Sequence, residues 1–135
     1  MKPRLTRLAA STCAAVALGA CSPAQAGHET IAITINHSRF EPAAFEVAAG
    51  TTVTFVVRND DPIAHELIVG DEVAQAVHET GTEAHHGAKP GEISIPAGEQ
   101  RSTTYGFDRP GRVLLGCHLP DHYDYGMRGH VDVIP

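Results

Sequence analysis

The chain has 135 residues, of which 10 are basic and 16 acidic, giving a formal net charge of −6 with neutral histidines. This length suits one domain with a modest core and is short for two. The acidic balance argues against nucleic acid as a partner, because proteins that bind nucleic acid present basic surfaces.

The N-terminal segment, residues 1–26, has the layout of an export signal. Lys2, Arg4 and Arg7 precede an apolar run at residues 8–20, and the segment contains no acidic residue. The run is shorter than the about 20 residues that a membrane-spanning helix requires. We therefore expect an exported protein that is either periplasmic or anchored to the membrane as a lipoprotein.

Two cleavage sites fit this signal. Residues 18–21 resemble a bacterial lipobox that ends at Cys21, where a lipid would be attached, whereas residues 24–26 fit an ordinary signal-peptidase site. Contact with a membrane is expected only through a lipid on Cys21. We divide the chain into a signal peptide and tether at residues 1–26 and a folded domain at residues 27–135.

From residue 30 onward, apolar and polar residues alternate with the period of two that is typical of half-buried strands. Ile31, Ile33 and Ile35 form one such run, and Val53 and Phe55 belong to another. The expected strands are residues 30–36, 45–47, 51–58, 65–69, 92–95, 101–107, 112–117 and 130–134. These eight short strands, separated by turns rich in glycine and proline, predict an all-β sandwich or barrel.

Residues 71–89 interrupt the strand pattern. The segment is polar, shows no sustained alternation and contains His78, His85 and His86. We interpret it as an inserted loop with a helical turn at residues 72–77. The three histidines predict an auxiliary copper or zinc site, since imidazole binds both metals, although a polar loop accounts for them equally well.

Cys117 is the only thiol of the expected mature domain, because Cys13 lies within the signal and Cys21 at or near the cleavage point. It therefore has no intramolecular disulfide partner. An unpaired thiol in an exported protein indicates a reactive or metal-bound residue, with a buried inert thiol as the alternative.

Cys117, His122 and Met127 follow one another at intervals of five residues. A strand would place side chains at this odd separation on opposite faces, and a helix would also turn them away from a shared face. A shaped loop is required, for which Pro120 and Gly126 supply the bends. A thiolate, an imidazole and a thioether in one loop predict a soft or borderline metal, with copper the best fit.

His65 is the best candidate for a second imidazole. It follows a turn at residues 59–62 and begins an expected strand, so it lies at an end of the sandwich that a loop carrying Cys117 can reach. Two histidines and one cysteine in a trigonal plane, with a weak and distant methionine, form a blue-copper electron-transfer centre.

Catalysis is the main alternative for Cys117, because a thiolate beside an imidazole can act as a nucleophile. Such a dyad does not require His65 or Met127. Oxidase chemistry on dioxygen would need further copper ions and a much longer chain. We therefore expect that the protein is not an enzyme.

These residues resemble the cupredoxins, in particular the small bacterial plastocyanin- and azurin-like exported domains. The resemblance covers residues 31–133, and its specific part is the ligand spacing of the loop from Cys117 to Met127. The matching positions are Phe40, Pro42, Val47, Ala49, Gly50, Val53, Phe55, Asn59, His65, Cys117, Pro120, His122, Gly126 and Met127. The departures are the histidine-containing insert and the additional histidines His118 and His130.

The resemblance implies a Greek-key sandwich with one type 1 copper ion per chain. His65, Cys117 and His122 would bind the copper, and Met127 would lie axially. An asparagine near Asn59 would tie the ligand loops together by hydrogen bonds, with an Asx turn that satisfies its own backbone as the alternative. His118 directly follows Cys117 and should therefore point away from a metal that Cys117 binds, with a role either in packing or in supporting the ligands from outside.

Two functions are expected, the first from this resemblance and the second from extra metal that His78, His85 and His86 would capture. The first is a monomeric one-electron carrier in the cell envelope, with a redox protein there as its partner. The second is a periplasmic protein of copper storage, delivery or resistance, which needs no redox partner.

Overall fold

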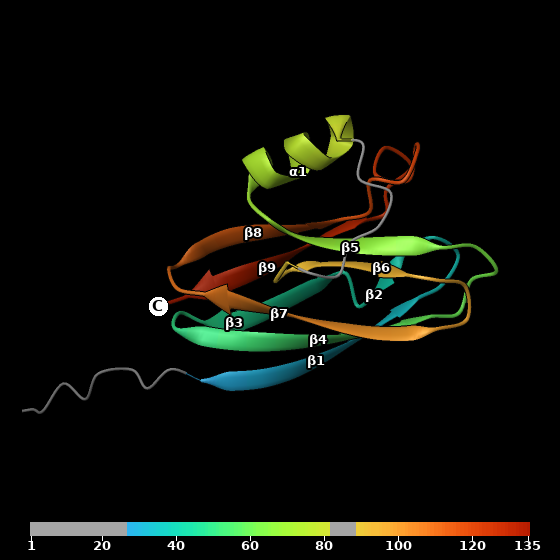
Figure 1. Cartoon of the computed structure of the whole chain (residues 1–135). Coiled ribbons are helices and arrows are strands. Elements are labelled where there is room, and N and C mark those ends of the chain that lie inside the picture. Colours follow the sequence, from blue (N-terminus) through green and yellow to red (C-terminus); the bar gives the residue numbers. More distant parts are fainter. Residues whose placement is uncertain (1–26, 82–88) are drawn as a thin grey trace, which may run out of the picture.

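The computed structural model describes residues 27–81 and 89–135, which form a sandwich of two β-sheets (Figure 1). The elements are β1 (His28–Ile35), β2 (Phe40–Glu41), β3 (Ala44–Ala48), β4 (Thr51–Asn59), β5 (His65–Gly70), α1 (Glu72–Thr80), β6 (Glu92–Ile95), β7 (Gln100–Phe107), β8 (Gly111–Gly116) and β9 (Arg128–Ile134). One sheet has the strand order β2-β1-β4-β7, and the other has the order β3-β9-β8-β5-β6. The chain crosses repeatedly between the sheets, which confirms the predicted all-β sandwich.

The core lies between the two sheets and follows the period-two pattern. In β4, the side chains of Val53, Phe55 and Val57 are buried, while alternate residues are exposed or half-buried. Phe55 makes edge contacts with Phe45 and Phe107, at ring-centroid distances of 6.4 and 6.2 Å. These rings join the sheets, and the apolar area that they remove from water is a main source of stability.

Strand β5 departs from the alternating pattern because it is buried at all of its residues. One of its faces packs on the core, and α1 covers the outer face of the sheet over β5 and β8 (Figure 1). The buried Gln75 of α1 donates from Nε2 to the carbonyl oxygens of Ile68 and Leu114, at 3.2 and 3.3 Å. These bonds fix the helix across the two strands.

The helix replaces part of the predicted loop at residues 71–89. It begins after Asp71, whose carboxylate accepts a hydrogen bond from the N–H of Ala74 at 2.9 Å, as expected of an N-cap. It extends to Thr80 and is longer than the predicted turn at residues 72–77. Residues 82–88 lie outside the described residues, and no helix of the described part is long and apolar enough to cross a membrane.

The eight predicted strands are all present, with ends that differ by a few residues. The sequence did not predict β2, because two residues are too few to show an alternation. Its existence depends on antiparallel pairing with β1, in which Phe40 lies opposite Ile35. The strand predicted at 112–117 ends at Gly116, so Cys117 begins the following loop.

Strand pairing gathers three chain segments at one end of the five-stranded sheet. Antiparallel pairing places Ile68 of β5 opposite Gly116 of β8, and Gly116 opposite Arg128 of β9. The start of β5, the end of β8 and the start of β9 therefore lie together. The loop at residues 60–64, which arrives from β4 of the other sheet, leads into the same end.

Candidate metal centre

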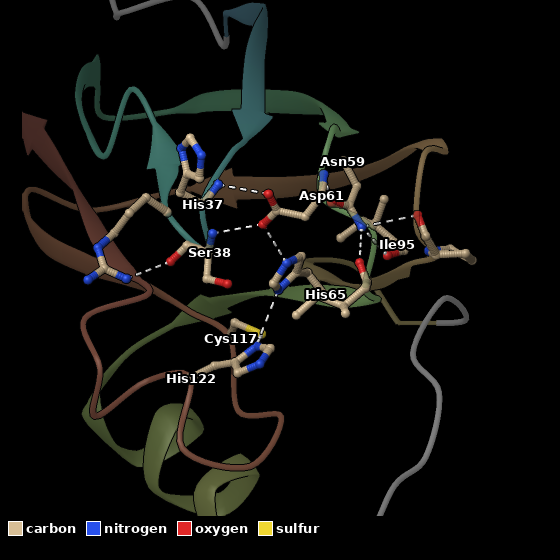
Figure 2. A network of polar contacts seen from close by, with 11 residues as sticks. His37, Ser38, Asn59, Asp61, His65, Ile95, Cys117 and His122 are labelled. Carbon is tan, nitrogen blue, oxygen red and sulfur yellow. Dashed lines mark hydrogen bonds and ion pairs between the residues drawn. The ribbon is translucent and has the colours of Figure 1, made fainter.

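Three of the four predicted ligands meet at this end of the sandwich (Figure 2). His65 is the first residue of β5, Cys117 directly follows β8, and His122 lies in the same loop as Cys117, between β8 and β9. Nδ1 of His122 is 3.3 Å from Nδ1 of His65 and 3.3 Å from Sγ of Cys117. One donor atom from each residue lies within 4.8 Å of the other two. His65 and Cys117 are buried and His122 is half-buried.

Met127, the fourth predicted ligand, is fully buried and is joined to the cluster through the main chain. Its N–H donates to the carbonyl oxygen of His122 at 2.9 Å, and its own carbonyl accepts from the N–H of Cys117 at 3.2 Å. Gly126, with φ of 96°, forms the bend that the sequence predicts. The other left-handed residue of the loop is Asp121, with φ of 69°, beside the predicted Pro120.

The second ring nitrogen of His65 is held by a buried carboxylate (Figure 2). Nε2 of His65 lies 2.9 Å from Oδ2 of Asp61. The same carboxylate accepts hydrogen bonds from the backbone N–H groups of His37 and Ser38, each at 2.7 Å. Burial alone would raise the pKa of Asp61, but the hydrogen bonds from Ser38, His37 and His65 outweigh burial and lower this pKa below its ordinary value.

Burial also lowers the pKa of His65, and the neighbouring His122 lowers it further, against the raising effect of Asp61. His65 is therefore neutral near neutral pH. A neutral imidazole is the form that coordinates a metal. The carboxylate and the burial together leave its Nδ1 with a lone pair directed at the cluster.

Unlike His65, the sulfur donor Cys117 is not in the protonation state that coordinates a metal. Burial raises the pKa of the Cys117 thiol to about 12, despite backbone hydrogen bonds to it from Glu66 and Leu119. The thiol is therefore protonated near neutral pH in the metal-free protein. Because the thiolate is the ligand, a metal that binds here displaces one proton.

Polar contacts behind Cys117 connect its loop to β5 and α1. The buried carboxylate of Glu66 accepts a hydrogen bond from the backbone N–H of His118 at 2.7 Å. The His118 ring lies 2.7 Å from Oε1 of Gln75 and 2.5 Å from a carboxylate oxygen of Glu79, and it stacks on Tyr123 at a centroid distance of 4.6 Å. His118 thus packs under α1, as predicted.

Asn59 forms the Asx turn that the sequence offers as one alternative, and its other bonds go to the turn before His65 and to the end of β6 rather than to the loop that carries Cys117. Its Oδ1 accepts from the N–H of Asp61 at 3.0 Å, which is an Asx turn. Its Nδ2 donates to the carbonyl oxygens of Ile63, Ile95 and Pro96, at 2.8, 3.1 and 3.1 Å. Asn59 therefore ties the turn that precedes His65 to the end of β6.

The predicted auxiliary site is only partly within the described residues. His78 lies on α1, where its Nδ1 donates to the carbonyl oxygen of Ala74 at 2.7 Å and its Nε2 is 3.4 Å from a carboxylate oxygen of Glu92. His85 and His86 lie outside the described residues. In the described ranges, the cluster with metal-ligand geometry is that of His65, Cys117 and His122. The auxiliary site stays a prediction.

Sequence reasoning did not single out Asp61 or Glu66. Both are acidic residues that flank His65 in the sequence, and both are buried. A carboxylate close to a candidate histidine ligand was a usable signal, because carboxylates commonly hold the second nitrogen of metal-binding histidines. The sequence alone does not say which flanking carboxylate turns inward.

Comparisons with known proteins identify a matching family and similar copper proteins. A family model described as a cupredoxin-like domain matches residues 8–84. The copper-resistant cuproprotein CopI of Pseudomonas aeruginosa is 28% identical over 147 aligned residues, which cover 84% of this chain and 81% of that protein. CopI of Rubrivivax gelatinosus is 33% identical over 99 residues, covering 70% of this chain and 59% of that protein.

Among solved structures, auracyanin A, a "blue" copper protein from Chloroflexus aurantiacus, is similar with a TM-score of 0.61. Its sequence identity is 26%, and the match covers 80% of this chain and 100% of that chain. The present chain belongs to the cupredoxin-like domain family, whose model matches more than half of its length. The matched residues include His65 and end before Cys117. The evidence that the loop from Cys117 to Met127 takes part in a metal site is therefore the geometry of its own residues.

The donor set fits copper. Two imidazole nitrogens and a thiolate sulfur suit a borderline or soft metal, whereas hard ions prefer oxygen ligands. The family, the copper proteins among its relatives and the gathered donors together support copper binding.

We predict that binding of Cu(II) near neutral pH releases about one proton per metal ion, because the Cys117 thiol, with its pKa of about 12, must ionise. The neutral His65 adds no further proton. As long as the pH is below that pKa, the apparent affinity for copper should therefore increase about tenfold for each unit by which the pH rises. Calorimetry in buffers of different ionisation enthalpy measures the released protons. A pH-independent affinity would exclude the thiol as a ligand.

Proposed function

We propose that the protein holds one copper ion in a type 1 site formed by His65, Cys117 and His122, with Met127 as a weak axial ligand. The observation that carries this proposal is the position of His122 Nδ1, which lies 3.3 Å from Nδ1 of His65 and 3.3 Å from Sγ of Cys117 at a buried end of the sandwich. Copper would supply one-electron redox chemistry at this position. The chain would hold its ligands in place and limit the access of water.

We further propose that the biological role is copper resistance in the cell envelope. Two relatives, at 28% and 33% identity, are named copper-resistant cuproproteins, which supports this role for the present chain. Export by residues 1–26 would place the protein where external copper arrives. A lipid on Cys21 would keep it at the membrane, and ordinary cleavage would leave it in the periplasm.

A one-electron carrier is the second candidate, and a different observation favours it. The three donor atoms lie on segments that strand pairing and main-chain hydrogen bonds hold together, and two of the residues are buried. A rigid ligand set lets copper change its oxidation state without large rearrangement of the protein. This candidate requires a redox protein as partner in the cell envelope, and the resistance role does not.

We propose no enzymatic activity for the chain. A catalytic cysteine acts as a thiolate and has a lowered pKa, whereas burial raises the pKa of Cys117 to about 12. This thiol is a poor nucleophile near neutral pH. Its surroundings suit a ligand that is ionised by the metal it binds.

The type 1 assignment predicts one Cu(II) ion per chain and an intense visible absorption band from charge transfer between the Cys117 thiolate and copper. The change Cys117→Ser should abolish the band, because it removes the sulfur. The control His28→Asn alters an exposed histidine of β1, outside both the cluster and the predicted auxiliary site, and should leave the band unchanged. Absorption spectroscopy with metal analysis measures both. A colourless copper adduct that survives Cys117→Ser unaltered would sink the assignment.

The two roles predict different outcomes in the host cell. For copper resistance, deletion of the gene should reduce growth on copper-rich medium, and the wild-type gene should restore it while the Cys117→Ser variant does not. An electron carrier should leave copper tolerance unchanged and should exchange electrons rapidly and reversibly with an envelope redox protein. Growth curves over a copper series, with the protein level checked by immunoblot, decide between them.

A further inference from the structure

We propose that Asp61 is a positioning residue of the copper site. It selects Nδ1 of His65 as the coordinating atom, and its buried negative charge favours Cu(II) over Cu(I). The inference rests on the proposed type 1 site. Asp61 would act through His65 and would not contact copper itself.

The contact between the two side chains determines the tautomer of His65. Oδ2 of Asp61 lies 2.9 Å from Nε2, and the side chain of His65 is 0% exposed. An ionised carboxylate can only accept, so Nε2 must carry the proton. In a neutral ring the lone pair then lies on Nδ1, the atom that is 3.3 Å from Nδ1 of His122. The carboxylate therefore directs the free lone pair into the cluster.

The carboxylate is itself fixed by a purpose-shaped turn. Two successive backbone N–H groups, from His37 and Ser38, donate to its oxygens at 2.7 Å each. Both residues have left-handed backbone conformations, with φ of 50° and 53°. Residues other than glycine adopt this conformation at a cost in free energy. Successive N–H groups in such conformations form a concave binding site for an anion. The turn is closed by hydrogen bonds in both directions between Asn36 and Arg39, each at 3.1 Å.

This arrangement also joins the two sheets at the metal end. His37 and Ser38 lie between β1 and β2 of the four-stranded sheet, whereas His65 begins β5 of the other sheet. Asp61 receives hydrogen bonds from both sides, and its own N–H is bound by Asn59. The His65 ring is therefore held at its Nε2 by a group anchored in the opposite layer.

The charge of Asp61 is the second part of the proposal. Its hydrogen bonds come from backbone N–H groups and from the imidazole of His65, so the carboxylate keeps its formal charge one imidazole away from the metal position. Asp61 is 8% exposed, so water screens this charge less than a surface charge. A nearby negative charge stabilises the more highly charged Cu(II) ion.

The chain offers a matched control in Asp60. Its side chain is 49% exposed and forms an ion pair with Arg58 at 2.8 Å. Asp60→Asn and Asp61→Asn each remove one negative charge from adjacent positions, but only Asp61 contacts His65. Asparagine at 61 keeps the shape of the side chain and cannot accept from all three donors at once.

The decisive measurement is the reduction potential of the copper-loaded protein. We expect Asp61→Asn to shift the ratio of Cu(I) to Cu(II) affinity at least about tenfold toward Cu(I), which corresponds to about 59 mV upward for one electron. Asp60→Asn should give less than about a third of this shift in potential. Equal shifts in the two variants, or no shift in Asp61→Asn with copper bound, would overturn the proposal.

A second readout needs no variant. Nitrogen-15 NMR of the metal-free wild-type protein should show His65 with its proton on Nε2, and a proton on Nδ1 would overturn the proposal even if Asp61→Asn fails to fold. The outcomes also separate this inference from the proposed function. A wild-type protein without the thiolate–copper band contradicts the type 1 site, whereas a wild-type band with an unchanged potential in folded Asp61→Asn contradicts only the role of Asp61.

Discussion

The antiparallel pairing of β5 with β8 is the constraint on which the metal centre depends. It sets Ile68 opposite Gly116, so the first residue of β5 and the first residue after β8 meet at the same end of the sheet. His65 and Cys117, far apart in the sequence, become neighbours for this reason. A slip of one residue in this register would turn β5 over and send His65 to the other face. The ligand geometry is thus set by the sheet, and the loop after Cys117 adds His122 and Met127.

Burial acts on the two kinds of donor in opposite ways. It keeps His65 neutral and ready to coordinate, but it also keeps the Cys117 thiol protonated, with a pKa of about 12. The protein therefore prepares the positions of its donors and leaves ionisation of the sulfur to the metal. Buried carboxylates need hydrogen-bond donors. Asp61 and Glu66, which flank His65 in the sequence, accept hydrogen bonds from the backbone N–H groups of Ser38 and His118, respectively. The same contacts hold the ligand loops.

The sequence predicted much of this arrangement, for physical reasons that also explain its failures. Strands with one buried face, such as β4, can be predicted because apolar and polar residues alternate along them. The turn signals before His65 likewise predicted that this residue begins a strand. Strand β2 exists only through its pairing with β1, and α1 depends on its contacts with β5 and β8. The local sequence pattern therefore missed β2 and predicted too short a helix for α1. The inward turn of Asp61 requires N–H groups from His37 and Ser38, which are distant in sequence.

In the proposed site, Cys117 and the two histidines bind one copper ion together. X-ray absorption spectroscopy at the copper edge can decide whether they do, because it identifies the atoms bonded to the metal. For the Cu(II)-loaded protein we expect one sulfur and two imidazole nitrogens bonded to copper, and loss of the sulfur in Cys117→Ser. Copper bonded only to nitrogen and oxygen in the wild-type protein would contradict the proposed site.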